Sequence, residues 1–418
     1  MMPPVSVADR FMQYVQIDTQ SNPQSNTVPT TEKQRNLSNL LAEQLKQIGV
    51  KEVIVNEYGY VYATIPSNSS KDLPVLCFCA HIDTAPDCSG THVKPILHKN
   101  YQGQSIVLPD DTSIVLDPEK MPYLKQHIGK DIITASGTTL LGADDKAGVA
   151  IIMTFAEILY SDDSILHGEI KILFTPDEEV GRGTNHLDME LLGADFAYTL
   201  DGGELGTFED ETFSANGFTV NIEGVIAHPG YAKGKMVNAI KLAAEIIAAL
   251  PKDRLAPEIT EKMQGFVHPV QIEGTAEKAR IDFIIRDFDT PQLLQYQDEI
   301  IRITRAIALN YPGVNIHFEE EEQYRNMKEV IDRYPFITEF AKEAYTNARL
   351  PFVKEPIRGG TDGSRLSFMG LPCPNIFTGM QAIHSKKEWV GVSDMEKAVE
   401  VLLNLVKVWE EKGENLHK

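Results

Sequence analysis

Hydrophobic positions follow two different periods from Met1 to about Asp201. Residues 32–49 have apolar side chains three and four positions apart, which predicts a helix. The largely apolar segment 147–160 predicts a second helix, and Pro, Gly and paired Asp predict a loop or hairpin at about 101–133. Short apolar runs predict strands at YVYATI (60–65), VLCFCAHI (75–82), IKILFTP (170–176) and FAYTL (196–200). Alternating helices and strands indicate an α/β sheet with helices on its faces.

The order of the predicted elements changes after Gly206. The pattern predicts a strand, a helix, two strands, a helix and a strand at 217–227, 237–250, 265–274, 278–289, 291–311 and 313–321. This order, β-α-β-β-α-β, is that of a ferredoxin-like domain. Helices at 335–348 and 394–412 and a strand at 374–379 then suit the first domain again. We therefore expect a main domain of residues 1–207 and 326–418, interrupted by an inserted α+β domain of residues 208–325.

The charge balance excludes partners with a strongly negative surface. The chain of 418 residues has 60 acidic and 39 basic side chains, a formal net charge of −21, which repels phosphate backbones and anionic membranes. We expect neither nucleic acid nor membranes as partners. The first residues do not resemble a signal peptide and no run of about 18 apolar residues occurs, so we expect a cytoplasmic protein. The four cysteines fit no zinc-finger or C-x-x-C spacing, and Cys77 and Cys79 are expected in the core on one face of a strand.

Acidic and histidine residues follow the ends of several predicted strands. They are His81 and Asp83, Glu178 and Glu179, Asp201 and His384. The carboxyl ends of strands in an open α/β sheet line the crevice where ligands bind, so these residues are expected to converge. Each one alone has an ordinary explanation: a histidine near an aspartate is often a surface contact, and acidic residues favour the start of a helix.

Metal chemistry would use these residues together. Asp83 lies two positions after His81, where its carboxylate can orient a metal-bound imidazole. In TPDEEVGRG, one acid can bind a metal while its neighbour takes a proton from the attacking water. In GADDKAG, an aspartate can bridge two cations, or the pair can simply start a helix, and the local sequence does not choose between Asp144 and Asp145. Each ion would have one histidine and one carboxylate of its own, besides the shared aspartate. Such a set of nitrogen and oxygen donors would suit Zn²⁺, with Co²⁺ or Mn²⁺ as substitutes.

Seven motifs together resemble one family of enzymes. They are AHIDTAPD, GADDKAG, TPDEEVG, TLDGG, GVIAHPG, RGGTDGSRLS and HSKKEWV, in the order and spacing of the co-catalytic zinc exopeptidases, a family that includes carboxypeptidase G and succinyl-diaminopimelate desuccinylase. The resemblance covers essentially the whole chain, and its details look most like the tripeptide aminopeptidases of that family. It implies a mixed α/β sheet with helices on both faces and an inserted ferredoxin-like lid or dimerisation domain.

The resemblance also implies a role for each matching residue. His81 and Asp201 would bind one zinc ion, Glu179 and His384 a second one, and Asp144 would bridge the two. Asp83 would orient His81, and Glu178 would be the general base. The family further implies a cis peptide bond between Asp144 and Asp145.

Three more residues match family positions that contact substrate. His228 would polarise the scissile carbonyl, either across a dimer or after domain closure, although His-Pro-Gly is also an ordinary turn. Arg358 would bind the carboxylate of the substrate through both of its oxygens, and Asn238 would assist.

The predicted function is removal of the N-terminal residue from short peptides, most of all tripeptides. The sheet face of the inserted domain would serve either as the surface of a homodimer or as a lid, and the sequence does not choose between the two. A dipeptidase or an N-acyl-amino-acid amidohydrolase of the same fold is the first alternative, since specificity comes from the pocket walls. A metal-binding protein without catalytic activity is the second alternative, and it predicts that a ligand or the base would be missing.

Overall fold

The computed structural model describes residues 5–416, which divide by their contacts into two units. Unit 1 contains the described residues up to Asp210, then Glu329–Glu355 and the chain from Thr361. Unit 2 contains Glu211–Lys328 and Pro356–Gly360. Unit 2 is therefore an insertion in unit 1, and each unit has its own hydrophobic core.

The main sheet of unit 1 has eight strands in the order β1-β2-β8-β3-β9-β16-β10-β15. Their bounds are β1 Glu52–Val55, β2 Val61–Ile65, β3 Leu76–His81, β8 Ile170–Thr175, β9 Phe196–Gly202, β10 Thr207–Glu209, β15 Val353–Lys354 and β16 Asn375–Phe377. The four central strands β8, β3, β9 and β16 are parallel, while β1, β2 and β10 pair antiparallel with their inner neighbours. The carboxyl ends of the four central strands therefore lie at one edge of the sheet.

Helices cover both faces of this sheet. The larger core involves α1 (Val7–Val15), α2 (Gln34–Ile48), α3 (Ala143–Ser161), α8 (Pro335–Asn347) and α10 (Val392–Lys412). The smaller core, on the other face, involves α4 (Met189–Leu192) and α9 (Asp362–Phe368). A further short helix, α7, spans Lys328–Ile331. On β3, Phe78 packs into the larger core, whereas Cys77 and Cys79 pack into the smaller one. The predicted α/β fold and the core position of these two cysteines are confirmed.

A second sheet of unit 1, in the order β17-β18-β7-β4, carries the segment around His384. Its strands are β4 Ile96–His98, β7 Ile132–Thr134, β17 Met380–Gln381 and β18 Trp389–Gly391. The predicted excursion at about 101–133 contains a hairpin of β5 (Ile106–Val107) and β6 (Val115–Leu116) and a 3-10 helix, η1 (Pro122–His127). Leu108, Leu124 and Trp389 form its small core.

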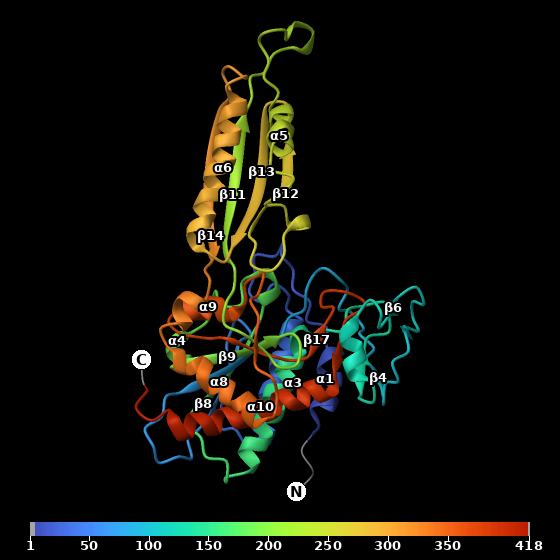
Figure 1. The fold of residues 1–418 in the computed structure, drawn as a ribbon, viewed down its shortest axis with the longest axis vertical. Helices are drawn as coiled ribbons and strands as arrows, with labels where there is room; N and C mark the ends of the chain where they lie inside the picture. The colour runs from blue at the N-terminus through green and yellow to red at the C-terminus, as the bar shows by residue number, and fades with distance from the viewer. Residues whose placement is uncertain (1–4, 417–418) are drawn as a thin grey trace. The chain divides into compact units, whose positions relative to one another are not determined.

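Unit 2 has the predicted ferredoxin-like order of elements (Figure 1). It consists of β11 (Ser214–Glu223), α5 (Ala239–Ala248), β12 (Phe266–Gly274), β13 (Lys278–Asp287), α6 (Thr290–Ala308) and β14 (Asn315–Tyr324), with short 3-10 turns η3 (Pro229–Tyr231) and η4 (Pro257–Ile259). The antiparallel sheet has the order β12-β13-β11-β14, and both helices pack on one of its faces against Phe218, Val220 and Ile222. The prediction that the first strand continues to residue 227 is wrong: β11 ends at Glu223, and Val225 pairs with Val237 instead of with β13.

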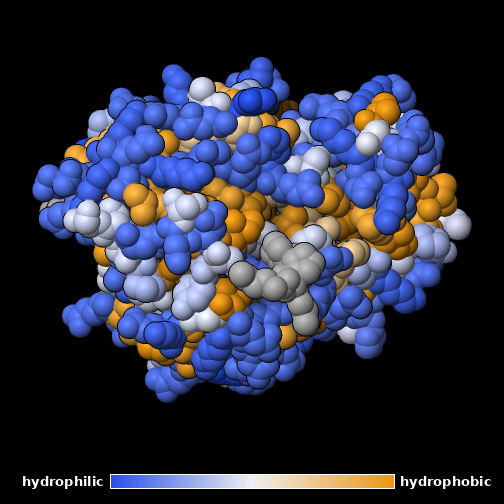
Figure 2. All heavy atoms as spheres, turned by 90° about the horizontal axis from the view of Figure 1, so that it is seen from below, coloured by the Kyte–Doolittle hydropathy of each residue, from blue (hydrophilic) through white to orange (hydrophobic). Residues whose placement is uncertain are grey.

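The surface is mostly hydrophilic where it is drawn. Figure 2 shows one face of the molecule, on which hydrophilic residues cover most of the area and hydrophobic residues appear in patches between them. Among residues 5–416, none of the helices combines the length and the apolar composition that crossing a membrane requires.

Candidate metal centre

The carboxyl edge of the central strands brings together five of the predicted site residues. His81 ends β3, Glu179 follows β8, and Asp201 lies near the end of β9. Asp144 lies in the first turn of α3, and His384 lies in the loop between β17 and β18 with the uncommon positive φ of 58°. The parallel order of β8, β3 and β9 explains why residues so far apart in sequence meet here.

These residues form two groups of three that share Asp144. In the first group, His81 Nε2 lies 2.9 Å from Asp144 Oδ1 and 3.8 Å from Asp201 Oδ1. In the second group, His384 Nε2 lies 3.0 Å from Asp144 Oδ2 and 3.0 Å from Glu179 Oε2. Within each group, the candidate ligand atoms all lie within 4.8 Å of one another. The two oxygens of Asp144 thus face different histidines.

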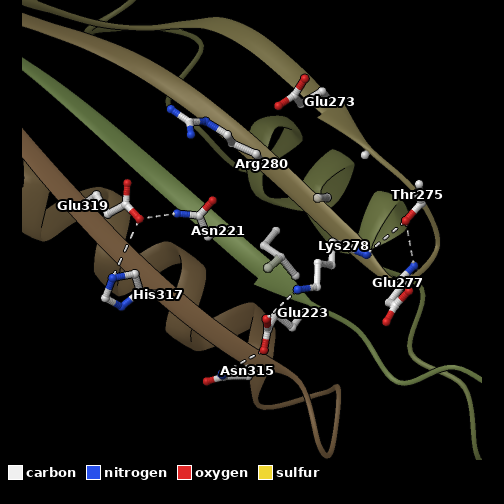
Figure 3. Close-up of a pocket in the computed structure, with 13 residues that line it drawn as sticks. Asn221, Glu223, Glu273, Thr275, Glu277, Lys278, Arg280, Asn315, His317 and Glu319 are labelled. Carbon is white, nitrogen blue, oxygen red and sulfur yellow. Dashed lines mark hydrogen bonds and ion pairs between the residues drawn. The ribbon is translucent and has the colours of Figure 1, made fainter.

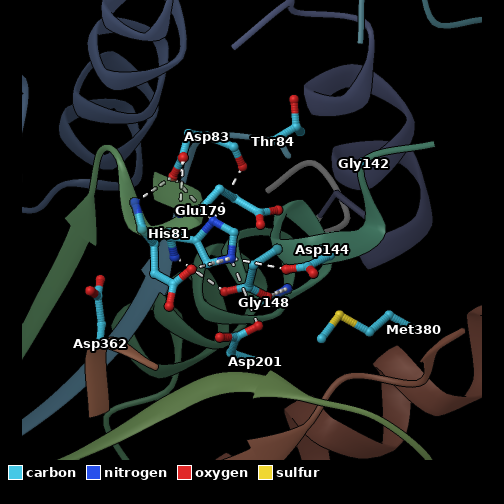
Figure 4. A network of polar contacts seen from close by, with 12 residues as sticks. His81, Asp83, Thr84, Gly142, Asp144, Gly148, Glu179, Asp201, Asp362 and Met380 are labelled. Carbon is cyan, nitrogen blue, oxygen red and sulfur yellow. Dashed lines mark hydrogen bonds and ion pairs between the residues drawn. The ribbon is translucent and has the colours of Figure 1, made fainter. Parts of the chain in front are cut away.

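Asp83 connects the first histidine to the acidic segment after β8 (Figure 4). Asp83 Oδ1 lies 3.3 Å from Nδ1 of His81, on the side of the ring away from Asp144. The same carboxylate accepts backbone hydrogen bonds from Glu178 (3.0 Å) and Glu179 (3.2 Å), and its side chain is fully buried. Asp83 therefore fixes the ring of His81 and the backbone of both glutamates.

The two adjacent aspartates point to different partners. The carboxylate of Asp145 accepts hydrogen bonds from the backbone N–H groups of His81 (3.2 Å) and Gly148 (3.2 Å), whereas that of Asp144 faces the two histidines. Position 148 must be glycine, because a Cβ there would lie 1.9 Å from the oxygen of Leu200. The Asp144–Asp145 peptide bond is cis, as the family resemblance implied.

Burial and mutual repulsion change the pKa values of the acids. Burial raises the pKa of Glu178 and Asp201 well above the usual range and that of Glu179 to about 7. Burial acts in the same direction on Asp144, but hydrogen bonds from His384 and His81 outweigh it and lower its pKa. Hydrogen bonds to Asp144 and Glu179 raise the pKa of His384 to about 11. The site gathers more negative charge than it balances.

The residues fit a metal ion. Glu179 Oε1 is buried and has no hydrogen-bond partner in the part of the chain that the structure describes. Over the same residues, 5–416, no lysine or arginine forms an ion pair with Asp144, Glu178, Glu179 or Asp201. A cation would satisfy the free oxygen and offset the repulsion, and nitrogen and oxygen donors in groups of three are typical of zinc.

Three supporting residues were not predicted from the sequence. The buried carboxylate of Glu388 accepts hydrogen bonds from the start of α3, Asn375 accepts one from the backbone of Asp201, and Asp362 accepts one from Thr175. Each leaves a weak signal: Glu388 is an acid four positions after His384 in a basic stretch, and Asn375 is a polar residue in an apolar strand. Asp362 lies within the family motif RGGTDGS.

The three predicted substrate residues lie in unit 2. His228 is exposed, and its Nδ1 accepts a hydrogen bond from the backbone of Gly230 (3.1 Å). The side chain of Asn238 caps α5 by accepting a hydrogen bond from the N–H of Lys241 (3.3 Å). Arg358 donates hydrogen bonds to backbone oxygens in the loop 260–264, including that of Gln264 at 2.9 Å, and its guanidinium lies over the ring of Phe213.

Unit 2 also has a hollow of about 820 Å³ on the face of its sheet that the helices leave open (Figure 3). Both of its basic side chains already have acidic partners: Lys278 pairs with Glu223 of the same hollow at 3.2 Å, and Arg280 pairs with Asp282, which is not one of the lining residues, at 2.9 Å. Asn221 donates to Glu319 at 3.0 Å. These side chains are already satisfied, so the hollow is a weaker candidate for the functional site than the acidic cluster in unit 1.

Comparison with known proteins decides the family. The model of peptidase family M20/M25/M40 matches residues 140–408. The chain belongs to this peptidase family. It is 46% identical to Peptidase T of Listeria monocytogenes serotype 4a over 403 residues, which are 96% of this chain and 98% of that protein. The family membership and the predicted enzyme class, a peptide hydrolase, are confirmed.

Two solved structures have a fold similar to that of this chain. The aminopeptidase PepT of Bacillus cereus superposes with a TM-score of 0.75 at 23% identity, covering 96% of this chain and 98% of that one. A tripeptidase of Staphylococcus aureus gives a TM-score of 0.75 at 23% identity, covering 97% and 98%. The chain therefore shares its fold with both proteins over nearly its whole length.

Proposed function

We propose that the chain is a di-zinc aminopeptidase that removes the N-terminal residue from short peptides, most of all tripeptides. The observation that carries the proposal is the orientation of Asp144, whose two oxygens lie 2.9 Å and 3.0 Å from the nitrogens of different histidines. The similarity to Peptidase T supports peptides as the substrate class, and the structural similarity to a tripeptidase suggests their length.

Five side chains would hold two zinc ions. His81 and Asp201 would bind one ion, His384 and Glu179 the other, and Asp144 would bind both. Bound there, the ions would activate a water molecule and polarise the peptide carbonyl. Cobalt or manganese would suit the same donors.

Glu178 would move the protons of the reaction. Its carboxylate lies beside the first group, with Oε2 4.0 Å from His81 Nε2, and Asp83 accepts a hydrogen bond from its backbone N–H. It would take a proton from the attacking water and later give it to the leaving amine. Burial raises its pKa, which favours this second step, because a carboxylic acid can donate where a carboxylate cannot.

Arg358 would recognise the free carboxylate of the peptide. Hydrogen bonds to the loop 260–264 and the ring of Phe213 hold its guanidinium in one orientation within unit 2. A fixed, planar guanidinium can bind both oxygens of a carboxylate. Asn238 would assist from the start of α5, where its side chain is already ordered as a cap.

His228 would stabilise the oxyanion in the active site of a second subunit. The chain enters unit 2 at the start of β11 and leaves it after β14, whereas the segment that carries His228 follows the opposite end of β11 (Figure 1). The ten residues of β11 place about 30 Å between these two ends. A homodimer formed through the inserted domain would bring His228 to a partner.

Peptide length and metal dependence test the activity. We expect the zinc-loaded protein to hydrolyse Ala-Ala-Ala faster than Ala-Ala, a tetrapeptide or N-acetyl-Ala-Ala-Ala, and a chelator to abolish hydrolysis. Faster cleavage of the dipeptide or of the acetylated peptide would instead favour a dipeptidase or an amidohydrolase. Glu178→Gln should keep its zinc and lose about 10²–10⁴-fold in turnover. Glu190→Gln, an exposed residue of α4, is the matched control.

Subunit mixing tests the position of His228. We expect Glu178→Gln and His228→Ala to be inactive separately, and activity to return when the two variants exchange subunits. A mixed dimer has one site with an intact Glu178 and a histidine from the other subunit. If the mixture stays inactive although exchange is shown by a size tag, His228 acts within its own subunit.

A further inference from the structure

Glu388 is a buried carboxylate that bonds to the backbone beside a candidate metal ligand. Glu388 is 1% exposed and lies four positions after His384, in the loop before β18. Oε2 accepts hydrogen bonds from the N–H groups of Leu141 (2.7 Å) and Gly142 (2.8 Å), and Oε1 accepts one from Asp144 (3.0 Å). One side chain therefore connects the loop of one candidate ligand to the backbone of another.

These three hydrogen bonds offset the burial of the charge. A carboxylate out of water is costly unless its oxygens accept hydrogen bonds, and bonds to an ionised acceptor are about twice as strong as neutral ones. The N–H groups at the start of a helix have no partners within the helix. Glu388 supplies a partner for one of these groups, the N–H of Asp144 in the first turn of α3, and binds the N–H groups of the two residues just before the helix. Gly142, at the start of the helix, has a φ of 84° and no side chain that could act as a cap.

We propose that Glu388 is a positioning residue for the metal centre: it fixes the backbone of Asp144 relative to the loop of His384. The inference rests on the proposed function, because it assumes that these two residues bind metal. The segment of residues 141–144 makes three hydrogen bonds to one rigid group, so the carboxylate of Asp144 is held with one oxygen toward each histidine. Loss of the bonds should weaken metal binding where Asp144 and His384 act together.

If Glu388 had only a structural role, its substitution would affect stability but not metal binding. If Glu388 only caps α3, its loss would lower stability and leave the affinity for metal unchanged once the protein is folded. The decisive measurement is therefore metal affinity, obtained on folded protein by titration of the metal-free form with Zn²⁺ and, separately, with Co²⁺, whose visible spectrum reports ligand geometry.

The test compares two substitutions of similar chemistry. Glu388→Gln keeps the shape but places an amide where only acceptors fit, and we expect binding of one of the two ions to weaken by about 10–100-fold. We also expect kcat to fall while KM changes little, and the Co²⁺ spectrum to change. Glu410→Gln is the control, because Glu410 is a buried carboxylate of unit 1 whose oxygens bond to Ser69 and Lys71. It should bind both ions as the unchanged protein does.

A second variant keeps the test possible if Glu388→Gln does not fold. Glu388→Asp keeps the charge but is one methylene shorter, so it should retain part of the network and give an intermediate affinity. Unchanged affinity in both Glu388 variants, or equal losses in Glu388→Gln and Glu410→Gln, would overturn the inference alone. Failure of the unsubstituted protein to bind zinc would overturn the proposed function and this inference with it.

Discussion

The side-chain oxygen of Asn375 accepts a hydrogen bond of 2.9 Å from the backbone N–H of Asp201. Asn375 begins β16, the parallel neighbour of β9, and is fully buried. The same oxygen accepts a hydrogen bond from Thr199 (2.9 Å), and the amide donates one to Glu209 (2.6 Å). A polar side chain from one strand thus fixes the end of the next, as Asp83 fixes the backbone after β8.

Replacement of Asn375 by Ala should disturb both stability and the metal centre. The N–H of Asp201 and the hydroxyl of Thr199 would lose their buried acceptor, which costs about 1–3 kcal/mol of unfolding free energy. We expect about 10–100-fold weaker metal binding in the group that contains Asp201, since its backbone would no longer be fixed. Denaturant unfolding and zinc titration measure the two effects separately. Wild-type zinc affinity in a destabilised variant would show that the hydrogen bond has no influence on the ligand.

Gly183 is packed against the carboxylate of Asp362, so a methyl group there should destabilise unit 1. A Cβ at position 183 would lie 2.1 Å from Oδ1 of Asp362. The other carboxylate oxygen of Asp362, Oδ2, accepts a hydrogen bond of 2.6 Å from the hydroxyl of Thr175. We expect Gly183→Ala to cost about 1–3 kcal/mol of unfolding free energy by overpacking. Gly203→Ala is the control, because a Cβ there would meet no atom within 4 Å. Equal unfolding free energies of the two variants would mean that Asp362, at the start of α9, can move away from the added methyl group without loss of stability.

The sequence predicts the residues that lie at strand ends but not the residues that hold them. His81, Glu179 and Asp201 can be found because short apolar runs mark the strands and parallel strands end at one edge of the sheet. Glu388 and Asn375 belong to no periodic pattern, and Glu388 bonds to residues 244–247 positions away. Such pairs follow from the packing of the whole domain, which a local pattern does not contain.

The choice between the two adjacent aspartates has the same cause. Asp144 and Asp145 are the same residue type in one short stretch, so local chemistry assigns either of them to either role. Their different directions arise from the backbone, where both residues have non-helical φ and ψ at the start of α3. The family resemblance selected Asp144 because it includes the register of the motif, and in the structure the carboxylate of Asp144, not that of Asp145, faces the rings of the two histidines.

Removal of the metal should loosen unit 1 and leave unit 2 unchanged. The acidic cluster would lose the cations that offset its repulsion, and a ligand present at 100 times its dissociation constant stabilises the folded state by about 2.7 kcal/mol. We expect a chelator to speed amide hydrogen exchange in residues 81–85, 142–148 and 177–182. The strands of unit 2 should exchange at the same rate with and without chelator. Equal protection of the three acidic segments in both conditions would contradict a metal bound there.

Two histidines of unit 1 should make the protein less stable as the pH falls. Burial lowers the pKa of His98 and His167 below the usual value of 6.5, because an imidazolium ion is disfavoured away from water. Below that pH the unfolded chain takes up protons that the folded protein resists, so the unfolding free energy falls as the pH drops through 6.5 toward the folded pKa values.

Substitution of His167 by Gln should therefore flatten the pH dependence. His167 is 3% exposed, and its Nδ1 lies 2.6 Å from the oxygen of Gly168, a contact that the neutral ring can make as a donor. Between about pH 7 and 5 we expect the slope of unfolding free energy against pH to be smaller in the variant by up to about 1.4 kcal/mol per pH unit. Urea unfolding of chelated protein at several pH values measures both slopes, with the acidic cluster contributing equally to each. Parallel curves for the two proteins would mean that His167 gains its proton as easily in the folded protein as in the unfolded chain.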